Sequence, residues 1–372
     1  MIKKIKILHI LPNLSHGGAE RVCFNILNNL NLDKFSPSLL LFKENNSGNE
    51  FKSILKSKGI EIISLEKKGL IDLKNFFQII NEIKKIQPDI IHTHLGGDIY
   101  GRFAAKICKT PVIVSTEHNL NYSERTSAAY LKTFSAKYAN KIFAVSEAVK
   151  KDAIKRYNLN PEKIETIYNG IDLNIFKTES ENSRTEKENY VLGGLGRLTE
   201  QKGFATLIDA VLKTKHKNYQ VNIAGTGELE TELKNRIKTL GLSDRINLLG
   251  LVDSKKFIDD LDIFIFPSNW EGLGLAVLEA AALKKPIIAS NIDGVKEIIN
   301  LNSGLLFEAN NVSNLAEKID YLIDNINSSE TQERVKAAHE KVVNTFSLEK
   351  MIKSYESAYE NLINKYENIT GK

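Results

Sequence analysis

Two cations follow the apolar segment 190–196 and lie five residues apart. Arg197 comes directly after this segment, and Lys202 comes directly before Gly203, where an amphipathic helical pattern begins. A guanidinium and an ammonium on one loop can hold a diphosphate from two sides, because both donate strong hydrogen bonds to phosphate oxygens. Two solvated surface cations are the alternative, and the position at a strand end favours the anion site.

A glycine-bearing loop after the apolar segment 262–267 carries two glutamates eight residues apart. Glu271 precedes a helical pattern that begins near residue 275, and Glu279 lies about one turn inside it. The free amides at a helix start attract an anion, and carboxylates accept hydrogen bonds from sugar hydroxyls. Because Gly274 and a Pro-Ser pair flank these glutamates, the loop is a stronger candidate than a chance pair of surface carboxylates.

Glycines mark two more turns after strand-like segments. Gly17 and Gly18 open a helical pattern after the first such segment, and Gly227 ends a Gly-Thr-Gly turn in the second half. A backbone without a Cβ lets a phosphate approach closely, although an ordinary tight strand-to-helix turn would use the same residues. The dinucleotide fingerprint G-x-G-x-x-G is absent after the first strand, which argues against an NAD enzyme.

Four histidines lie at or near strand ends of the first half. His92 and His94 share one face of a strand, and His118 ends another strand, while His16 precedes the first glycine turn. We expect His92 to be a hydrogen-bonded core residue and His118 to face the site. The sequence has no Cys pair and no His-x-x-x-His helix, so no metal site is expected.

Strand-like segments and helix-length amphipathic segments alternate almost throughout, which predicts parallel sheets covered by helices on both faces. In such sheets ligands bind outside the carboxyl ends of the strands, where the residues above lie. The expected strands are 5–10, 38–42, 60–65, 89–95, 111–116, 141–146, 163–168, 190–196, 219–225, 246–250, 262–267, 286–290 and 304–307. The expected helices are 19–31, 72–86, 97–108, 124–139, 146–157, 203–215, 228–240, 275–283 and a helical tail, 312–367.

A polar stretch without a core pattern interrupts this alternation and predicts two domains. We place a first α/β domain at 1–173, a linker at 174–189 and a second α/β domain at 190–348. The terminal helix, about 349–372, is expected to pack back on the first domain. The predicted fold class is two doubly wound, Rossmann-like domains that face each other across a cleft.

The charge is unevenly distributed between the two halves. The chain has 372 residues and a net charge of +5, of which residues 1–175 contribute +9 and residues 176–372 contribute −4. Such an imbalance arises from solubility charges or from a first domain that faces an anionic partner. Without a dense basic run and an aromatic platform, nucleic acid is not an expected partner.

Composition indicates an ordinary globular chain in a reducing compartment. Apolar residues make up 42% and charged residues 26%, and the two cysteines, Cys23 and Cys108, are expected to be buried free thiols. No segment has the ~18 uncharged apolar residues of a membrane span. Since Lys6, His9 and Pro12 interrupt the first apolar run, it predicts a strand rather than a signal peptide. We expect a cytoplasmic location.

Taken in order, these motifs resemble the retaining GT-B glycosyltransferases of glycosyltransferase family 4. The resemblance covers nearly the whole chain, and each short motif gains specificity from its place in the series. The motifs are Gly-Gly-Ala-Glu at 17–20, His-Thr-His at 92–94, Thr-Glu-His at 116–118, Ile-Tyr-Asn-Gly-Ile-Asp at 167–172, Gly-Arg-Leu-Thr-Glu-Gln-Lys-Gly at 196–203, Ala-Gly-Thr-Gly-Glu-Leu at 224–229 and Glu-x7-Glu at 271–279.

The resemblance implies a nucleotide-sugar donor, with UDP favoured, and no metal or other cofactor. It makes 1–173 the acceptor-binding domain and 190–348 the nucleotide-sugar-binding domain. It assigns the donor diphosphate to Arg197 and Lys202, with the backbone of Gly17 and Gly18 closing from the other domain. It assigns the ribose hydroxyls to Glu279.

Other positions receive the sugar and the base by the same resemblance. Glu271 and the amides of Leu273, Gly274 and Leu275 would hold the sugar and the β-phosphate. His118 would lie by the transferred sugar.

The remaining positions complete the implied site. His16 and His94 join His118 on the acceptor side, the backbone of Leu251 and Val252 would meet the base, and Gly227 joins the donor-binding set. The sequence departs from the family pattern at Lys284 and at 293–297, where only the local loop shape is expected to differ.

The resemblance also implies retention through front-face attack, in which the leaving phosphate takes the acceptor proton, because no carboxylate pair is evident for a double displacement. The favoured function is sugar transfer to a lipid-linked or saccharide acceptor in bacterial surface polysaccharide synthesis, including O-antigen, capsule and lipopolysaccharide. A nucleotide-sugar 2-epimerase and a two-domain sugar-binding protein are the alternatives.

Segment 124–141 suggests two roles for one helix. Tyr130, Leu131, Phe134 and Tyr138 recur at helical spacing, with lysines at 132, 137 and 141 beside them. A core-facing helix with a solvated lysine face is the favoured interpretation. The alternative is peripheral docking on anionic lipid at the inner face of the membrane.

Overall fold

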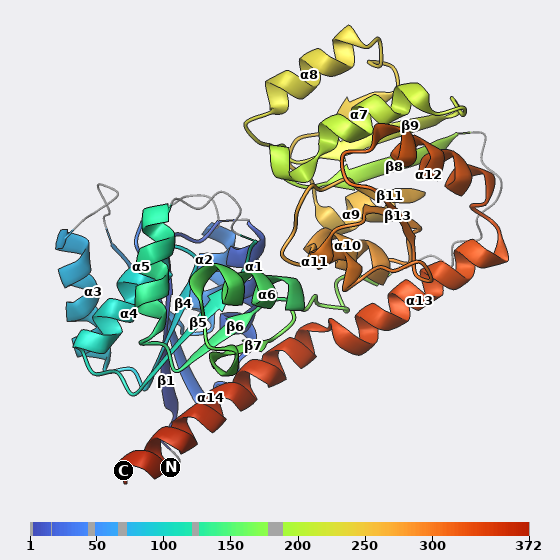
Figure 1. The fold of residues 1–372 in the computed structure, drawn as a ribbon. Helices are drawn as coiled ribbons and strands as arrows, with labels where there is room; N and C mark the ends of the chain where they lie inside the picture. The colour runs from blue at the N-terminus through green and yellow to red at the C-terminus, as the bar shows by residue number, and fades with distance from the viewer. Residues whose placement is uncertain are drawn as a thin grey trace. The chain divides into compact units, whose positions relative to one another are not determined.

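A computed structural model describes residues 3–15, 17–43, 49–65, 73–120, 126–177 and 189–371. The chain forms two compact units (Figure 1). Unit 1 comprises residues 1–170 together with 348–372, and unit 2 comprises residues 171–347. Of the predicted linker, residues 178–188 lie outside the described residues, and Phe176 just before them is buried.

Unit 1 contains a parallel sheet of seven strands in the order β3-β2-β1-β4-β5-β6-β7. One face packs against α3 and α4, and the other packs against α1 and α2. The strands are β1 (Ile5–Leu11), β2 (Phe35–Leu41), β3 (Glu61–Ser64), β4 (Ile90–His94), β5 (Val112–Glu117), β6 (Lys141–Ala144) and β7 (Ile164–Thr166). The helices are α1 (Gly18–Asn29), α2 (Asn49–Ser57), α3 (Leu73–Ile86), α4 (Gly97–Ile107), α5 (Thr126–Ala136) and α6 (Glu147–Tyr157).

Unit 2 contains a parallel sheet of six strands in the order β10-β9-β8-β11-β12-β13. Its largest core cluster joins this sheet to α7, α8 and α12. The strands are β8 (Tyr190–Leu195), β9 (Tyr219–Ala224), β10 (Ile246–Leu248), β11 (Ile263–Phe266), β12 (Ile287–Ser290) and β13 (Leu305–Phe307). The helices are α7 (Phe204–Lys213), α8 (Glu230–Thr239), α9 (Ser254–Asp259), α10 (Leu275–Ala282), α11 (Asp293–Lys296), α12 (Val312–Asp324) and α13 (Ser329–Thr345).

The terminal helix α14 (Leu348–Thr370) belongs to unit 1 and packs against its sheet (Figure 1). Two buried tyrosines connect it to the strands. The Tyr359 hydroxyl lies 2.6 Å from His92 Nδ1, and the Tyr355 hydroxyl lies 3.3 Å from Thr116 Oγ1. These buried hydrogen bonds fix the register of α14 on β4 and β5, because an unpaired polar group there would be costly.

The predicted alternation is confirmed, with differences that have physical causes. Strand β2 begins three residues earlier than predicted and includes Pro37, which lacks an N–H donor. Pro37 pairs with β1 but not with β3, because pairing with β3 begins at Ser38. The missing donor therefore costs no hydrogen bond on the β3 side of the strand. The sequence missed the short helices α2, α9 and α11, and the helical tail is divided into α12, α13 and α14.

Each sheet has one point where the strand order reverses, and such a point is where ligands bind in open α/β sheets. In unit 1 it lies between β1 and β4, and in unit 2 between β8 and β11. The loops that follow these strands therefore lie side by side at the carboxyl edge of each sheet. Over the described ranges, none of the helices combines the length and apolarity that crossing a membrane requires.

Candidate functional site

The loops after β8 and β11 meet at the strand reversal of unit 2 and are joined by an ion pair. Lys202 Nζ lies 2.5 Å from Glu271 Oε1, and both side chains are largely buried, at 16% and 9% exposed. The Gln201 side chain donates to the Trp270 carbonyl at 3.0 Å, and the Asn269 amide donates to the Gln201 carbonyl at 2.7 Å. The structure thus brings together two predicted site residues that are 69 positions apart.

Glycines allow these loops to approach so closely. Gly203 has φ +63°, and a Cβ at this position would lie 2.1 Å from the Pro267 carbonyl oxygen. At Gly227, a Cβ would lie 2.3 Å from the Leu198 carbonyl oxygen, which explains the glycine there without a ligand. Close backbone packing therefore accounts for part of the glycine pattern in the sequence.

Arg197 follows β8 and is exposed, and among the described residues its side chain makes one long hydrogen bond, of 3.5 Å to Gln201 Oε1. A guanidinium held this loosely keeps its donors available to an anion. Together Arg197, Lys202 and Glu271 carry one net positive charge at the carboxyl edge of the sheet. The arrangement can attract a diphosphate and offers a carboxylate beside it.

The remaining predicted donor residues of unit 2 follow the same strand ends. Gly274 is the N-cap of α10 and has φ +93°. Leu275 begins the helix, and because the first amides of a helix have no intrahelical partner, its N–H is not used within α10. Leu273 and Glu279 are buried, each at 2% exposed. Leu251 and Val252 follow β10, and Leu251 is 78% exposed. The predicted set therefore lies on the loops after β8, β9, β10 and β11.

At the strand reversal of unit 1, Gly17 caps α1 and Gly18 begins it. A Cβ on Gly17 would lie 2.3 Å from Glu20 Oε2, and the Ser15 hydroxyl donates to Glu20 Oε1 at 3.0 Å. The carboxylate of Glu20 thus occupies the space next to the helix start, where negative charge is favourable. His16, predicted for the acceptor side, lies outside the described residues.

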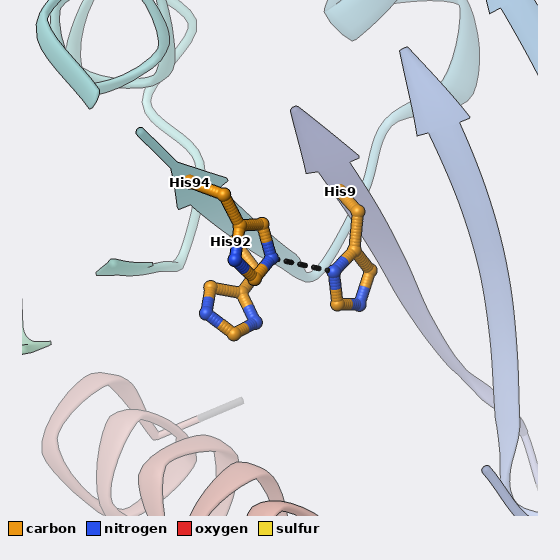
Figure 2. Close-up of side chains that lie close together, drawn as sticks. All are labelled: His9, His92 and His94. Carbon is orange, nitrogen blue, oxygen red and sulfur yellow. Dashed lines mark hydrogen bonds between the residues drawn. The ribbon is translucent and has the colours of Figure 1, made fainter. Parts of the chain in front are cut away.

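The structure joins two predicted histidines and adds one that the sequence missed. His94 Nδ1 lies 3.1 Å from His118 Nε2. Figure 2 shows the second contact, in which His94 Nε2 lies 3.1 Å from His9 Nδ1. We call His9, His94 and His118 the histidine chain. His9 was noticed only as a break in the first apolar run, yet it pairs in register with His92 across β1 and β4.

All four histidines of this region are buried, and burial disfavours the charged imidazolium. It lowers the pKa of His9 to about 3 and that of His118 to about 4. The pKa values of His92 and His94 are also lowered well below 6.5, first by burial and then by neighbouring histidines. His92 has partners at both ring nitrogens, Tyr359 and Thr116, so the expected core histidine is confirmed.

His9, His92 and His94 are also close enough for one metal ion to reach a nitrogen of each (Figure 2). However, hydrogen bonds already use both nitrogens of His92, both of His94 and one of His9. A metal would have to replace these bonds, which already pair five of the six ring nitrogens. The donor set therefore fits a hydrogen-bonded core better than a metal centre.

Next to His118 lies a group of buried charges that the sequence analysis missed. Lys132 Nζ lies 2.6 Å from Glu117 Oε2 and 3.7 Å from Asp98 Oδ2, and Arg102 Nη2 lies 3.6 Å from Glu117 Oε1. Burial raises the pKa of Asp98 to about 6. Burial alone would also raise the pKa of Glu117, but Lys132 and Arg102 outweigh it and lower that pKa.

This group corrects the favoured interpretation of segment 124–141, of which residues 124 and 125 lie outside the described residues. Lys132 points into unit 1, whereas Tyr130, Leu131 and Phe134 are exposed at 72%, 47% and 42%. The expected core-facing apolar side is wrong, because two buried carboxylates draw Lys132 inward and turn the apolar side chains outward. Lys141 is also partly covered and pairs with Glu165 at 3.2 Å.

Sequence models of two families match the chain one after the other. The model described as Glycosyltransferase Family 4 matches residues 16–175, and the model described as Glycosyl transferases group 1 matches residues 175–342. The two parallel-sheet α/β units, with seven and six strands, have the GT-B fold. The chain belongs to the family 4 (group 1) glycosyltransferases.

Known relatives match nearly the full length. An Escherichia coli enzyme named UDP-Gal:alpha-D-GlcNAc-diphosphoundecaprenol alpha-1,3-galactosyltransferase is 27% identical, over 97% of this chain and 98% of that protein. The Staphylococcus aureus capsular polysaccharide biosynthesis glycosyltransferase CapM is 27% identical, over 80% of this chain and 83% of that protein. The crystal structure of a glycosyltransferase from Rickettsia africae shares 26% identity and a TM-score of 0.82, over 97% of this chain and 99% of that one.

Proposed function

We propose that this glycosyltransferase moves a sugar from a UDP-sugar to a lipid-linked saccharide, with retention of the anomeric configuration and without a metal ion. The relative named for UDP-galactose and a diphosphoundecaprenol acceptor supports this choice of donor and acceptor. The relative named for capsular polysaccharide supports a role in surface polysaccharide synthesis. The proposal adds a donor class, an acceptor class and a stereochemical course to the family assignment.

The observation that carries the proposal is the Lys202–Glu271 ion pair with exposed Arg197 beside it. When a glycosyl phosphate bond breaks, negative charge grows on the departing diphosphate. Positive groups fixed before the reaction stabilise that charge without reorganising. Arg197 and Lys202 supply them, and the free amide of Leu275 at the start of α10 adds a helix N-terminus.

We propose retention because two described carboxylates at strand ends, Glu271 and Glu117, are already held by cations. Double displacement needs a carboxylate about 5 Å from its acid partner at the reacting carbon. Glu271 is held by Lys202, and Glu117 in unit 1 is held by Lys132 and Arg102. The departing phosphate, stabilised by Arg197, then accepts the proton of the attacking hydroxyl. For this transfer, the hydroxyl must attack the sugar on the same face from which the phosphate departs.

Trp270 gives a direct test of donor binding, because it is the one tryptophan of the chain and precedes Glu271. We expect UDP to change its fluorescence saturably. UDP should bind more tightly than GDP, and Arg197→Ala should weaken UDP binding about tenfold, the loss of one charge-assisted bidentate contact. Lys217→Ala, a lysine on the loop before β9, is the matched control. Equal responses to UDP and GDP, or an unchanged affinity in Arg197→Ala, would contradict the assignment.

Metal independence is tested by chelation. Turnover in 5–10 mM EDTA should equal turnover in buffer, because the cationic side chains carry the role that Mg²⁺ has in other transferases. Loss of activity that Mg²⁺ or Mn²⁺ restores would refute this part of the proposal.

We also place the protein at the membrane surface through an α5 patch, defined as Tyr130, Leu131 and Phe134 with Lys137. Lys137 Nζ lies 3.3 Å from the centre of the Phe134 ring, so the exposed apolar group carries a cation beside it. The neighbouring helix α4 adds the exposed Lys106, whose Nζ lies 5.9 Å from the centre of the Tyr138 ring. Apolar side chains with lysines beside them suit an anionic lipid surface, where a lipid-linked acceptor would be found.

Vesicle sedimentation tests the α5 patch. We expect binding to vesicles with phosphatidylglycerol and weak binding to pure phosphatidylcholine. Replacing Leu131 and Phe134 together by Ser should weaken binding about tenfold or more, since each loses about 1 kcal/mol of apolar burial. Lys137→Gln should weaken it about fivefold. Leu301→Ser removes a more exposed leucine, at 74% against 47% for Leu131, from unit 2 and should have no effect. Variants that bind like the unaltered protein would exclude this surface.

A further inference from the structure

The histidine chain runs across three adjacent strands at the carboxyl edge of unit 1. His9 lies on β1, His94 ends β4, and His118 directly follows β5. The two contacts between these rings are both 3.1 Å, nitrogen to nitrogen. The outer nitrogens, His9 Nε2 and His118 Nδ1, are buried and have no hydrogen-bond partner among the described residues.

Counting protons leaves only two sets of tautomers for the three rings of the histidine chain. Because burial keeps the three imidazoles neutral, each carries one N–H and one lone pair. His94 must then donate to one neighbour and accept from the other. Either all three rings carry the hydrogen on Nδ1, or all three carry it on Nε2, so the tautomer of His118 is tied to that of His9 through His94.

The two arrangements differ in where they leave an unpaired N–H. With hydrogen on Nε2, the unpaired donor would be His9 Nε2, on a ring that is fully buried and packed against His92. With hydrogen on Nδ1, the unpaired donor is His118 Nδ1, which is buried directly after β5 in a residue that is 7% exposed, whereas His9 is 0% exposed. A permanently orphaned buried N–H is rare because it loses a full hydrogen bond, whereas a ligand oxygen can satisfy a donor at the edge.

A contact with Cys23 is compatible with both arrangements. Cys23 Sγ lies 4.0 Å from His9 Nδ1, and burial raises the pKa of this thiol, so it stays protonated. The thiol can accept weakly from an Nδ1–H or donate weakly to an Nδ1 lone pair. The choice therefore rests on His9 Nε2, where the Nδ1–H arrangement leaves only a lone pair unpaired and avoids an orphaned buried N–H.

We propose that His9 and His94 fix His118 in the Nδ1–H tautomer, so that its Nδ1 donates a hydrogen bond to a substrate oxygen. His118 is therefore a donor that recognises a hydroxyl or an anionic oxygen, and it does not act as a base. His9 and His94 are positioning residues that act through it. That the oxygen belongs to a glycosyl substrate rests on the proposed function, whereas the tautomer itself does not.

Nitrogen NMR on ¹⁵N-histidine-labelled protein measures the tautomers directly, without substrate. Two-bond ¹H–¹⁵N correlations separate Nδ1–H from Nε2–H imidazoles, and single substitutions assign the rings among the seven histidines. We expect His9, His94 and His118 all to show the Nδ1–H pattern. An Nε2–H pattern at His118, or different tautomers among the three, would overturn the proposal.

His94→Phe tests the coupling, because it breaks both contacts and keeps a ring of similar shape. The His118 signals should lose the Nδ1–H pattern, and kcat/KM should fall about tenfold or more. Tyr359→Phe is the matched control, since it removes a partner of His92 in the same core and leaves the histidine chain intact. In Tyr359→Phe the His118 pattern and kcat/KM should stay as in the unaltered protein. A His118 pattern that persists in His94→Phe would overturn the coupling.

The two proposals fail separately. If no nucleotide-sugar is turned over but the three rings show one shared Nδ1–H tautomer, the proposed function is wrong and the histidine chain stands. If transfer occurs but His118 carries its hydrogen on Nε2, the histidine chain is wrong and the proposed function stands.

Discussion

Removing Arg197 and removing Lys202 should have different consequences, because the two cations differ in their surroundings. Both are proposed to stabilise the charge on the leaving diphosphate, so alanine at either position should lower kcat by ~10²–10³, equivalent to about 3–4 kcal/mol of transition-state stabilisation. Arg197 is exposed, with one long hydrogen bond, and its loss should leave stability within about 0.5 kcal/mol.

Lys202 also holds Glu271, whose side chain is 9% exposed. Lys202→Ala would leave that carboxylate largely buried without this partner, at a cost of about 1–3 kcal/mol, between the values for exposed and fully buried pairs. For a unit of this size the melting temperature should fall by roughly 3–10 °C. Changing Lys202 and Glu271 together to Met and Gln should recover most of the stability and none of the activity.

The assay combines transfer from a UDP-sugar with thermal unfolding followed by circular dichroism. Lys217→Ala serves as the control for loss of an exposed lysine. Near-normal turnover in Arg197→Ala would refute the diphosphate assignment. A melting temperature in Lys202→Ala equal to that of Lys217→Ala would refute the structural role of the ion pair.

Three further predictions follow from unit 1 and from one glycine turn. The lowered pKa values of the buried histidines, about 3 for His9 and about 4 for His118, mean that the unfolded chain binds more protons below pH 6.5. The buried histidines therefore leave stability unaffected above pH 6.5 and lower it as the pH drops towards 4. Each such histidine lowers the free energy of unfolding by up to about 1.4 kcal/mol per pH unit. A melting temperature that stays constant from pH 7 to 5 would contradict this. Tyr359→Phe should lower the free energy of unfolding in urea by about 1–3 kcal/mol, because His92 loses its 2.6 Å partner. Tyr366→Phe on the same helix is the control and should change this free energy by less than about 0.5 kcal/mol. Equal effects of the two substitutions would be evidence against the hydrogen bond. Gly227→Ala should cost about 2 kcal/mol or more, since its Cβ would lie 2.3 Å from a backbone oxygen, and an unchanged urea midpoint would show that the turn can move aside.

The alternation of strands and helices could be predicted because most strands are short segments rich in apolar residues. Features decided by tertiary contacts could not. The inward position of Lys132 depends on Glu117 and Asp98, which lie on other elements. Helical periodicity alone therefore predicted, wrongly, that the apolar side chains of this helix face the core. The role of His9 depends on the register between β1 and β4, which the sequence does not show.

The site could be predicted in part for the same reason. Strand ends are local features, so the loops that carry Arg197, Lys202 and Glu271 were identifiable, whereas the ion pair between two of them depends on strand order. Lys284 illustrates a departure with a visible consequence. It stands where the family usually has glycine and adopts φ +53°, the left-handed conformation that glycine takes without strain.

Product analysis tests the central claim most directly. The protein is incubated with UDP-sugars and an undecaprenyl-diphosphate-linked saccharide, and the product is examined by mass spectrometry and by NMR of the new glycosidic bond. We predict that the acceptor gains one sugar in the donor's own anomeric configuration, and that Arg197→Ala reduces this product at least a hundredfold. An inverted linkage would contradict retention. No transfer from any UDP-sugar, or free epimerised UDP-sugar in place of a linked product, would contradict the proposed function itself.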